Sequence, residues 1–421
     1  PSLPFSLLTN QDGSSAIESP DVADLPLRLR DRAVGLLASR GITDEGTIDA
    51  GRVRSLLFLD SDHLLGQNRD FSELLVWNAV TRQQVQRYDL VAARGESSPN
   101  TRRPLPLFGG ELALGPFGPL GPASGGRGLV AFDPASGRPS APWLVGREFF
   151  YVTTSIPGQR AVTIDRPVGT RAGENRPFLI NLWNSGEFAW RDPAPTSSPP
   201  RTTSAEPHPS PANTNPGTRA NPPQNPTPAS GTPAAAPRLQ PLASWDLLVN
   251  VGNDLVPQLL DLSTDGRVLG FALFGGNVIR LVSGENGSPL AEFVVASPVT
   301  GLAVASDALV AVATRETIQI WQAETGSPRA ILETRLAPLR LLRFSPNDEF
   351  LAVIGSTTPA VELWDPRSGQ LVARLETDQP PERLAFSSEG RRLAVADTSG
   401  QMQIWSIQDP VGLRRASELP T

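Results

Sequence analysis

The sequence predicts an all-β fold built from repeated four-stranded units, and three observations support this. Six segments share the same short apolar run, and five of them end in tryptophan. In the C-terminal half the equivalent positions recur about every 40 residues, the period of one four-stranded blade of a propeller. After residue 41, short alternating apolar runs bounded by Gly, Pro, Asn and Asp dominate, and helical periodicity is scarce.

The last residue of each apolar run is the anchor position of its repeat. A valine, Val282, replaces tryptophan in the sixth run. A seventh copy ends in Phe132, and its turn Asp133–Gly137 almost repeats Asp365–Gly369. Glycine five residues after the anchor takes a positive φ at low cost, as a tight turn between strands requires. The seven anchors are Trp77, Phe132, Trp183, Val282, Trp321, Trp364 and Trp405.

A second signal recurs upstream of the anchors, between two alternating apolar runs. It is a short turn of small polar residues, as in Ser345–Asp348 and Ser387–Gly390, with related turns at Ser263–Gly266 and Asp60–Asp62. Apolar residues that alternate with period two on both sides of such a turn predict a hairpin. We therefore expect this hairpin to join two strands of each repeat.

These motifs resemble those of the WD40-repeat β-propeller family. Leu-Trp-Asp at 363–365 matches the family's Trp-Asp signature, and Ile-Trp at 320–321 and 404–405 are common variants. The resemblance implies a single propeller, and seven blades is the family's usual number. It also implies a role in protein assembly, since most members are assembly platforms. The resemblance covers roughly residues 52–92, 104–192 and 240–416.

One departure from the family is clear. Its Gly-His pair is missing from every repeat, because the chain has only two histidines, His63 and His208. The Asp-His-Ser-Trp hydrogen-bond network of well-formed repeats therefore cannot be complete. We expect a degenerate, bacterial-type propeller that is held together mainly by apolar packing.

Residues 1–50 form an N-terminal extension before the first blade. A helix is expected at about 20–40, because Ser19 is a suitable N-cap, Pro20 suits the first helical position and Gly41 is a natural stop. It would pack on the propeller as a cap, or dock a partner. The strand-like run Leu3–Leu8 is expected to supply the outer strand of the last blade, with Leu413–Leu419 as the alternative.

A proline-rich linker divides the predicted propeller. Residues 51–192 hold blades 1–3, residues 193–238 are the disordered Pro/Ser/Thr-rich linker, and residues 239–421 hold blades 4–7. From position 192 to position 238 there are 14 prolines and no large aliphatic residue, so the segment cannot fold alone. We expect an extended insertion between blades, with a Pro-rich ligand as the alternative. A long loop is also expected within Gly95–Gly128.

Three features of the composition exclude classes of function. The chain has no cysteine, and all 37 basic residues are arginine, so thiolate, Schiff-base lysine and phosphate-loop lysine chemistry are excluded. No run of 18 apolar residues is present, so no transmembrane segment is expected. The net charge of −6 argues against nucleic acid as a partner. A chain starting at Pro1 without a hydrophobic leader is expected in the cytoplasm, with an extracytoplasmic location as the alternative if an upstream segment was removed.

No catalytic, cofactor-binding or metal-binding residue is predicted. His63 is expected to be an ordinary strand residue, and His208 lies in the linker, so the two cannot share a metal. The acidic pairs Asp348-Glu349 and Asp44-Glu45 are expected in solvated turns. Asn10–Gly13 lacks the ligands of a calcium loop.

The sequence therefore favours a non-catalytic scaffold for protein–protein interactions, or a structural subunit of a multiprotein complex. Its partners would be other proteins, bound through the propeller faces and loops, with no evident small-molecule substrate. Trp143, Trp190 and Trp245 lie outside the anchors and would be interface residues if exposed, or core residues otherwise. The alternative is a propeller enzyme, a carboxylate-based hydrolase or lyase with its site at the central channel.

Overall fold

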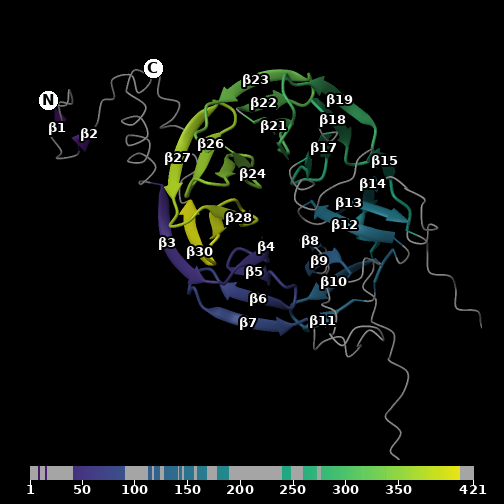
Figure 1. Cartoon of the computed structure of the whole chain (residues 1–421), viewed down its shortest axis with the longest axis horizontal. Coiled ribbons are helices and arrows are strands. Elements are labelled where there is room, and N and C mark those ends of the chain that lie inside the picture. The colour runs from purple at the N-terminus through teal and green to yellow at the C-terminus, as the bar shows by residue number, and fades with distance from the viewer. Residues whose placement is uncertain are drawn as a thin grey trace, which may run out of the picture.

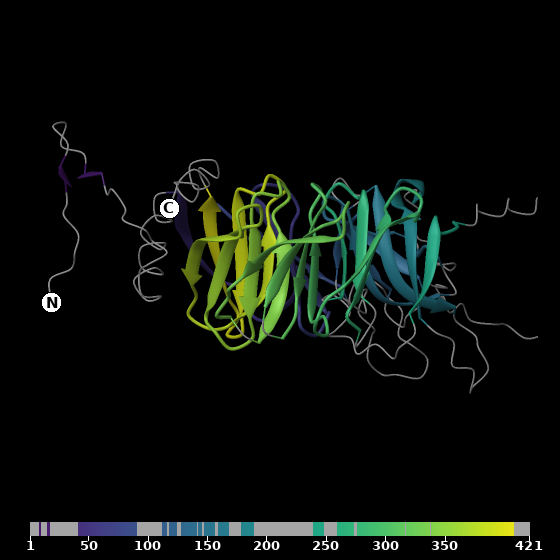
Figure 2. The same ribbon diagram turned by 90° about the horizontal axis from the view of Figure 1, so that it is seen from above.

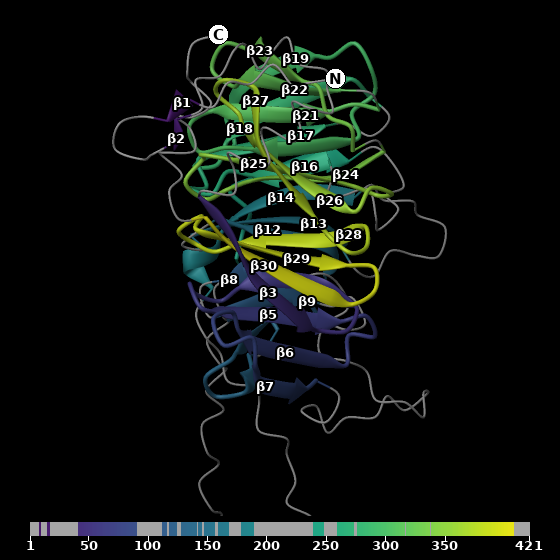
Figure 3. The ribbon, with the colours of Figure 1, turned by 90° about the vertical axis from the view of Figure 1, so that its left-hand side faces the viewer.

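The chain folds as a ring of seven four-stranded antiparallel sheets in a computed structural model (Figure 1). In six of the sheets the strands follow one another in sequence order, and the seventh takes its outer strand from the N-terminal part of the chain. The first strand of each sheet lies nearest the centre of the ring. Figures 2 and 3 show the sheets side by side around the ring, with strands that span its thickness. The structure describes residues 8–9, 15–16, 41–90, 112–115, 118–123, 128–140, 142–144, 147–155, 159–167, 178–188, 239–247, 259–272, 276–315, 317–336 and 338–407.

The seven blades are numbered by their anchors. Blade 1 contains β4 (Val53–Phe58), β5 (His63–Asn68), β6 (Glu73–Asn78) and β7 (Gln84–Asp89). Blade 2 contains β8 (Ala113–Gly115), β9 (Gly118–Pro122), β10 (Leu129–Asp133) and β11 (Arg138–Pro139). Blade 3 contains β12 (Arg147–Thr154), β13 (Arg160–Pro167), β14 (Phe178–Asn184) and β15 (Ala243–Leu247), with the 3-10 turn η3 (Ser185–Glu187) after β14. Blade 4 contains β16 (Leu260–Leu262), β17 (Val268–Ala272), β18 (Val278–Ser283) and β19 (Pro289–Val294).

The remaining blades complete the ring. Blade 5 contains β20 (Gly301–Val304), β21 (Leu309–Ala313), β22 (Ile318–Gln322) and β23 (Ser327–Leu332). Blade 6 contains β24 (Leu339–Phe344), β25 (Leu351–Gly355), β26 (Ala360–Asp365) and β27 (Gln370–Glu376). Blade 7 contains β28 (Pro381–Phe386), β29 (Arg392–Asp397), β30 (Gln401–Ile407) and β3 (Ile42–Asp49). A separate pair, β1 (Leu8–Thr9) and β2 (Ser15–Ala16), forms a two-stranded sheet.

All seven anchors lie on the third strand of a blade and are buried, which confirms the predicted repeat. Each packs against the preceding blade. Trp321 of blade 5 stacks on Phe293 of blade 4 with ring centroids 4.4 Å apart, and Phe132 of blade 2 meets Tyr88 of blade 1 at 4.8 Å. Trp77 of blade 1 joins the buried cluster that holds Ile404 of blade 7. The large ring at this position therefore fills the space between neighbouring sheets.

The two predicted turn types are also confirmed. The glycine five residues after the anchor has positive φ in four blades, from +61° at Gly326 to +74° at Gly287. In the hairpin between the first two strands, a serine hydroxyl accepts the amide of the residue five positions later. Ser345 accepts from Phe350 at 3.0 Å, and the same bond recurs at Ser263, Ser387 and Ser155.

The ring closes through an N-terminal strand, as expected, but the expected segment was wrong. The outer strand of blade 7 is β3, Ile42–Asp49, which pairs with β30 in antiparallel register. The run Leu3–Leu8 does not take this place, and the propeller already begins before residue 50. Closure by β3 means that the two ends of the ring are joined in one sheet. Removing an unpaired edge in this way protects β30 from pairing with other chains.

The proline-rich insertion lies within blade 3, and not between blades. The fourth strand of blade 3 is β15, which pairs with β14 so that Leu182 lies opposite Ala243. Residues 239–247 therefore belong to blade 3, which corrects the expected boundary. The predicted long loop in Gly95–Gly128 is wrong in part, because β8 and β9 lie inside that range. The predicted helix, the linker, Trp190, His208, Asn10–Gly13 and Leu413–Leu419 lie outside the described residues.

Blade 3 contains a buried polar network around its anchor. Trp183 Nε1 donates to Thr163 Oγ1 at 2.8 Å, and that hydroxyl donates to Asp165 Oδ2 at 2.7 Å. Arg147 Nε and Asn181 Nδ2 also donate to Asp165 Oδ1, at 2.7 and 2.8 Å. Burial raises the pKa of Asp165, and Arg147 and Thr163 oppose this rise. A tryptophan, a hydroxyl and an aspartate are thus linked without histidine.

Two further anchors donate their indole hydrogen to a polar side chain. Trp364 Nε1 donates to Glu362 Oε2 at 3.1 Å, and Thr334 donates to the same oxygen at 2.7 Å. Trp321 Nε1 donates to Gln319 at 3.2 Å. Beside the apolar packing that was expected to hold the blades mainly, polar partners other than histidine therefore satisfy these buried indole groups.

Candidate functional site: an arginine-lined central channel

A cavity of about 640 Å³ lies on the axis of the ring. Residues of the innermost strands β4, β8, β12, β16, β24 and β28 form its wall, so six blades contribute to it. Pockets that bind ligands typically occupy about 300 to 1,000 Å³. The cavity, here called the central channel, is therefore large enough to hold part of a ligand or of a partner protein.

One mouth of the channel opens at the face where the innermost strands begin. Because neighbouring strands of a blade are antiparallel, the turns between second and third strands lie on this same face. Arg52 directly precedes β4, and Arg69 directly follows β5, so both lie at this mouth. We call this side of the ring the basic face, and the other side the opposite face.

The charges that line the channel are mostly positive. Six arginines and two carboxylates line it, a formal excess of four positive charges in a chain whose net charge is −6. Such a local field in a concave, partly water-excluded site attracts negative groups. The lining charges are Arg52, Arg54, Arg69, Arg340, Arg343, Arg383, Asp261 and Glu382.

Three of these charges occupy the same position of successive blades. The pairing of the first two strands shifts register between Val53 and Ser55 in blade 1, and the residue left between them is Arg54. The same irregularity leaves Arg340 in blade 6 and Glu382 in blade 7. A bulge turns its extra residue out of the regular pleat, as at many binding sites. The bulges thus explain how apolar inner strands present charged groups to the channel.

The cluster on the basic face surrounds one carboxylate. Glu382 Oε1 lies 3.0 Å from Arg52 Nη2 and 3.8 Å from Arg340 Nη2. Arg383 Nε donates to the carbonyl oxygen of Arg54 at 2.6 Å, which joins blade 7 to blade 1. The guanidinium of Arg54 lies 5.0 Å from the ring centre of Phe71, and its buried Nε has no hydrogen-bond partner among the described residues.

Deeper in the channel a carboxyl group faces an exposed arginine. Burial raises the pKa of Asp261 to about 6, and the positive charge of Arg343 opposes this rise. Asp261 Oδ2 also accepts the amide of Val304 at 2.9 Å, which ties blade 4 to blade 5. Asp261 is therefore a structural link whose carboxyl also contributes to the wall of the channel.

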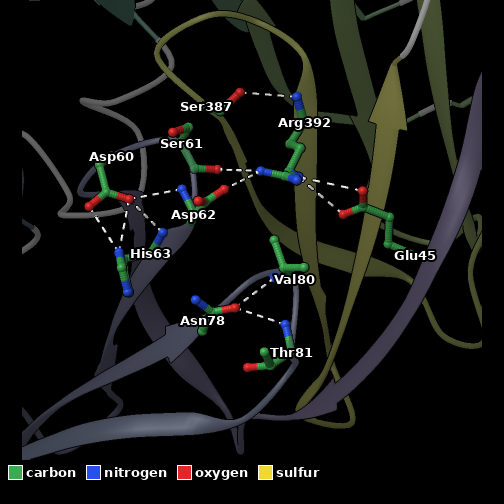
Figure 4. A network of polar contacts seen from close by, with 10 residues as sticks. All are labelled: Glu45, Asp60, Ser61, Asp62, His63, Asn78, Val80, Thr81, Ser387 and Arg392. Carbon is green, nitrogen blue, oxygen red and sulfur yellow. Dashed lines mark hydrogen bonds and ion pairs between the residues drawn. The ribbon is translucent and has the colours of Figure 1, made fainter.

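A polar network around Arg392, on the opposite face, holds the closure of the ring (Figure 4). Arg392 begins β29 in blade 7, and its Nε lies 3.2 Å from Glu45 Oε2 on β3. Its Nη1 donates at 2.7 Å both to Asp62 Oδ1 and to the carbonyl oxygen of Ser61, in the first turn of blade 1. Its amide donates to Ser387 Oγ at 3.0 Å. One side chain therefore connects the first blade, the last blade and the closing strand.

Each of the two acidic pairs departs in one respect from the prediction of solvated turns. Asp348 is in a turn with φ of +55°, but it is only 7% exposed, and both its oxygens accept the amide of Ser306 at 3.0 to 3.1 Å. Burial raises the pKa of Asp348 to about 6. Asp44 and Glu45 lie on β3, where the pairing with β30 shifts register before Gly46. The prediction of solvated turns was therefore wrong on two points: Asp348 is buried, and Asp44 lies on a strand.

The other candidate residues have ordinary structural places. His63 begins β5, as predicted, and its Nδ1 lies 2.9 Å from Asp60 Oδ2 (Figure 4), a contact that helps lower the pKa of Asp60. Trp143 is 1% exposed and stacks on Phe188 with centroids 5.6 Å apart, so it is a core residue. Trp245 packs against Phe271, with ring centroids 5.5 Å apart. In the described part of the chain, no group of three or more His, Asp or Glu residues could hold a metal ion.

Sequence reasoning missed the arginines of the channel. A signal was present, because Arg54, Arg340 and Glu382 each lie four residues before the phenylalanine that ends the first strand. Aligned repeats would have placed three charged residues at one inner position of adjacent blades.

Among the described residues, no helix is long and apolar enough to span a bilayer.

Comparison with known proteins finds a similarity to a WD repeat protein. No protein-family model matches the chain. It is 24% identical over 179 residues to the WD repeat-containing protein VIP3 of Arabidopsis thaliana, an alignment that covers 39% of this chain and 52% of that protein. The chain thus spans about half the length of the curated relative it matches. Seven four-stranded blades, an anchor on the third strand of each blade and this similarity together fit a WD40-repeat β-propeller.

Proposed function

We propose that this propeller is a non-catalytic scaffold for protein–protein interactions and serves as a subunit of a multiprotein complex. The fold and the similarity to a WD repeat protein support a role in protein interaction in general. The observation that carries the proposal is the charged mouth of the channel on the basic face, within a ring closed by β3. A rigid ring of this kind presents loops and a concave site without rearranging on binding.

The finer parts of the proposal concern the partners and their place. The partners are other proteins and not nucleic acid, because the net charge of −6 opposes a phosphate backbone. A cytoplasmic location and a bacterial source stay predictions. Cell fractionation with an antibody against the full chain tests the location.

The test of the scaffold is stoichiometric co-purification. The tagged full chain is purified from its native organism at moderate salt, beside a variant in which a short Gly-Ser turn replaces residues 193–237. The scaffold proposal expects a defined set of proteins in fixed ratio, and light scattering should report a complex of constant mass. Loss of this set in the shortened variant would place the binding site on the linker. A tagged chain that elutes alone under all salt conditions would contradict the proposal.

A second function, an enzyme with a carboxylate in the channel, rests on one observation. Asp261 has a raised pKa and lies near Arg343 in the cavity, and such perturbed groups often occur at active sites. The amide of Val304 already occupies one oxygen of Asp261, which supports a structural role. Activity against ester and glycoside substrate panels, lost on Asp261→Asn with the fold intact, would favour the enzyme over the scaffold.

A further inference from the structure

We propose that the mouth of the channel on the basic face binds an acidic peptide segment of a partner protein, through the carboxylates of its Asp and Glu side chains. This inference rests on the proposed scaffold function and names the chemistry of its partner. It is carried by the geometry of blades 6, 7 and 1, which are neighbours in the closed ring. The residues concerned are Arg52, Arg54, Arg69, Arg340 and Glu382.

The mouth of the channel holds more guanidinium groups than partners for them among the described residues. Arg52 and Arg340 share the single carboxylate of Glu382, at 3.0 and 3.8 Å. Arg54 leaves a buried Nε without a hydrogen-bond partner, and Arg69 is exposed with no ion pair among the described residues. A buried donor without a partner is costly, and a ligand oxygen at the mouth would remove this cost.

The charges around the mouth also select the kind of anion that can bind. Glu382 shows that the cluster accepts a carboxylate at hydrogen-bond distance from a guanidinium group. The same carboxylate, with Asp261 deeper in the wall, repels a densely charged phosphate polymer more strongly than an isolated carboxylate. The net charge of −6 over the whole chain adds to this repulsion. These charges favour a peptide with separated carboxylates over nucleic acid or polyphosphate.

The wall of the channel mixes apolar and charged groups, which suits a peptide. Tyr151, Leu341 and Phe344 line the channel beside the arginines. A peptide side chain can place its methylene groups on such a surface while its carboxylate meets a guanidinium group, because long polar side chains carry an apolar stem. Planar guanidinium groups also bind carboxylates through two parallel hydrogen bonds, which gives geometric selectivity.

The experiment measures binding of a fluorescein-labelled oligoglutamate peptide to the full chain by fluorescence anisotropy. A Gly-Ser peptide of the same length is the uncharged control. Arg340→Gln and Arg69→Gln are each expected to weaken oligoglutamate binding about tenfold, because each removes a charged contact. Arg267→Gln is the matched control on the opposite face, where this side chain is 75% exposed, and it should leave the affinity unchanged. The affinity should fall steeply as the salt concentration rises.

A variant that should strengthen binding distinguishes an effect on the site from damage to the fold. Glu382→Gln removes the internal carboxylate and frees Arg52 and Arg340, so it should bind oligoglutamate several-fold more tightly. Damage to the fold would weaken binding instead, and urea unfolding of each variant checks the fold. Equal binding by Arg340→Gln, by Arg267→Gln and by the unchanged chain would overturn the inference. Tighter binding of a DNA oligonucleotide or of inositol hexakisphosphate than of oligoglutamate would also overturn it.

The inference and the scaffold proposal can fail separately. If native partners co-purify equally with Arg340→Gln and with the unchanged chain, the scaffold stands and the acidic-peptide site is wrong. If no partner co-purifies with any form while oligoglutamate binds as expected, the site exists and the scaffold is in doubt. Both proposals would be supported if the Arg340→Gln and Arg69→Gln variants lose the native partners and oligoglutamate binding while the unchanged chain keeps both.

Discussion

Replacing Arg392 by alanine should weaken the closure of the ring. The side chain of Arg392 connects β29 to Glu45 on β3 and to Asp62 and Ser61 in the first turn of blade 1 (Figure 4). These contacts join the last blade, the closing strand and the first blade through one side chain. Without it, the last blade keeps its backbone pairing with β3 and the bond from Arg82 Nη1 to the carbonyl oxygen of Glu45, but loses the contacts with Asp62 and Ser61.

The size of the effect follows from the exposure of the partners. The side chains of Arg392 and Glu45 are 22% and 23% exposed, so this pair is partly shielded, whereas Asp62 is 50% exposed and screened by water. We expect about 1 kcal/mol from the pair with Glu45 and less from the pair with Asp62. The charged hydrogen bond to the carbonyl oxygen of Ser61 contributes about 1.5 kcal/mol. The free energy of unfolding should therefore fall by about 2 to 3 kcal/mol.

Urea unfolding followed by tryptophan fluorescence measures this change. The control is Arg267→Ala, because Arg267 is 75% exposed and lies 3.6 Å from Asp265, a contact worth about 0.5 kcal/mol or less. A double-mutant cycle with Glu45→Gln should show a coupling of about 0.5 to 1.5 kcal/mol with Arg392. A midpoint for Arg392→Ala no lower than that of Arg267→Ala would refute the assignment of Arg392 to ring closure.

Three further predictions test the buried groups and the insertion. Asp348→Asn keeps an acceptor for the amide of Ser306 and removes a buried charge, so it should stabilise the chain at pH 7.5 by roughly 1 to 3 kcal/mol. The folded pKa is raised from 3.8 to about 6, so the stability that Asp348 contributes is full below about pH 4 and is lost as the pH rises through about 6. The advantage of the variant should therefore shrink at pH 4, and an equal advantage at both pH values would contradict the burial argument. Thr163→Val leaves the buried Nε1 of Trp183 without its acceptor, so the free energy of unfolding measured in urea should fall by about 1 to 3 kcal/mol. The control is Thr317→Val, which removes a hydroxyl that contacts Thr314. An equal loss in this control would show that the effect is not specific to the Trp183 network. Replacing residues 193–237 with a short Gly-Ser turn should change the free energy of unfolding by less than about 1 kcal/mol, because β14 and β15 are adjacent strands, and collapse of the fold would show that the insertion contributes to blade 3.

Much of the blade architecture could be predicted from local sequence. Turn glycines such as Gly369 and turn serines such as Ser345 act on residues within five positions of themselves, so their signals are local. The anchors are likewise visible, because a large ring recurs wherever one sheet must be packed on the next. The number of blades was predicted for this reason.

The closing strand and the place of the insertion could not be predicted, because each depends on pairing between distant segments. β3 pairs with β30 although more than 350 residues separate Asp44 from Trp405. A short strand with mixed polarity, such as Ile42–Asp49, carries no mark of the partner it will join. The same holds for β15, which completes blade 3 only when it meets β14.

The sequence by itself determined the repeat, the all-β class and the absence of thiol and lysine chemistry, because these follow from residue identity and local spacing. Only the tertiary structure decided that Arg52, Arg340 and Glu382 meet at one mouth of the channel. They come from the two ends of the chain, and the ring brings them together when β3 closes blade 7 against blade 1. Charged residues that are far apart in the sequence form one site only because this closure brings them close together, since electrostatic attraction depends on separation in space.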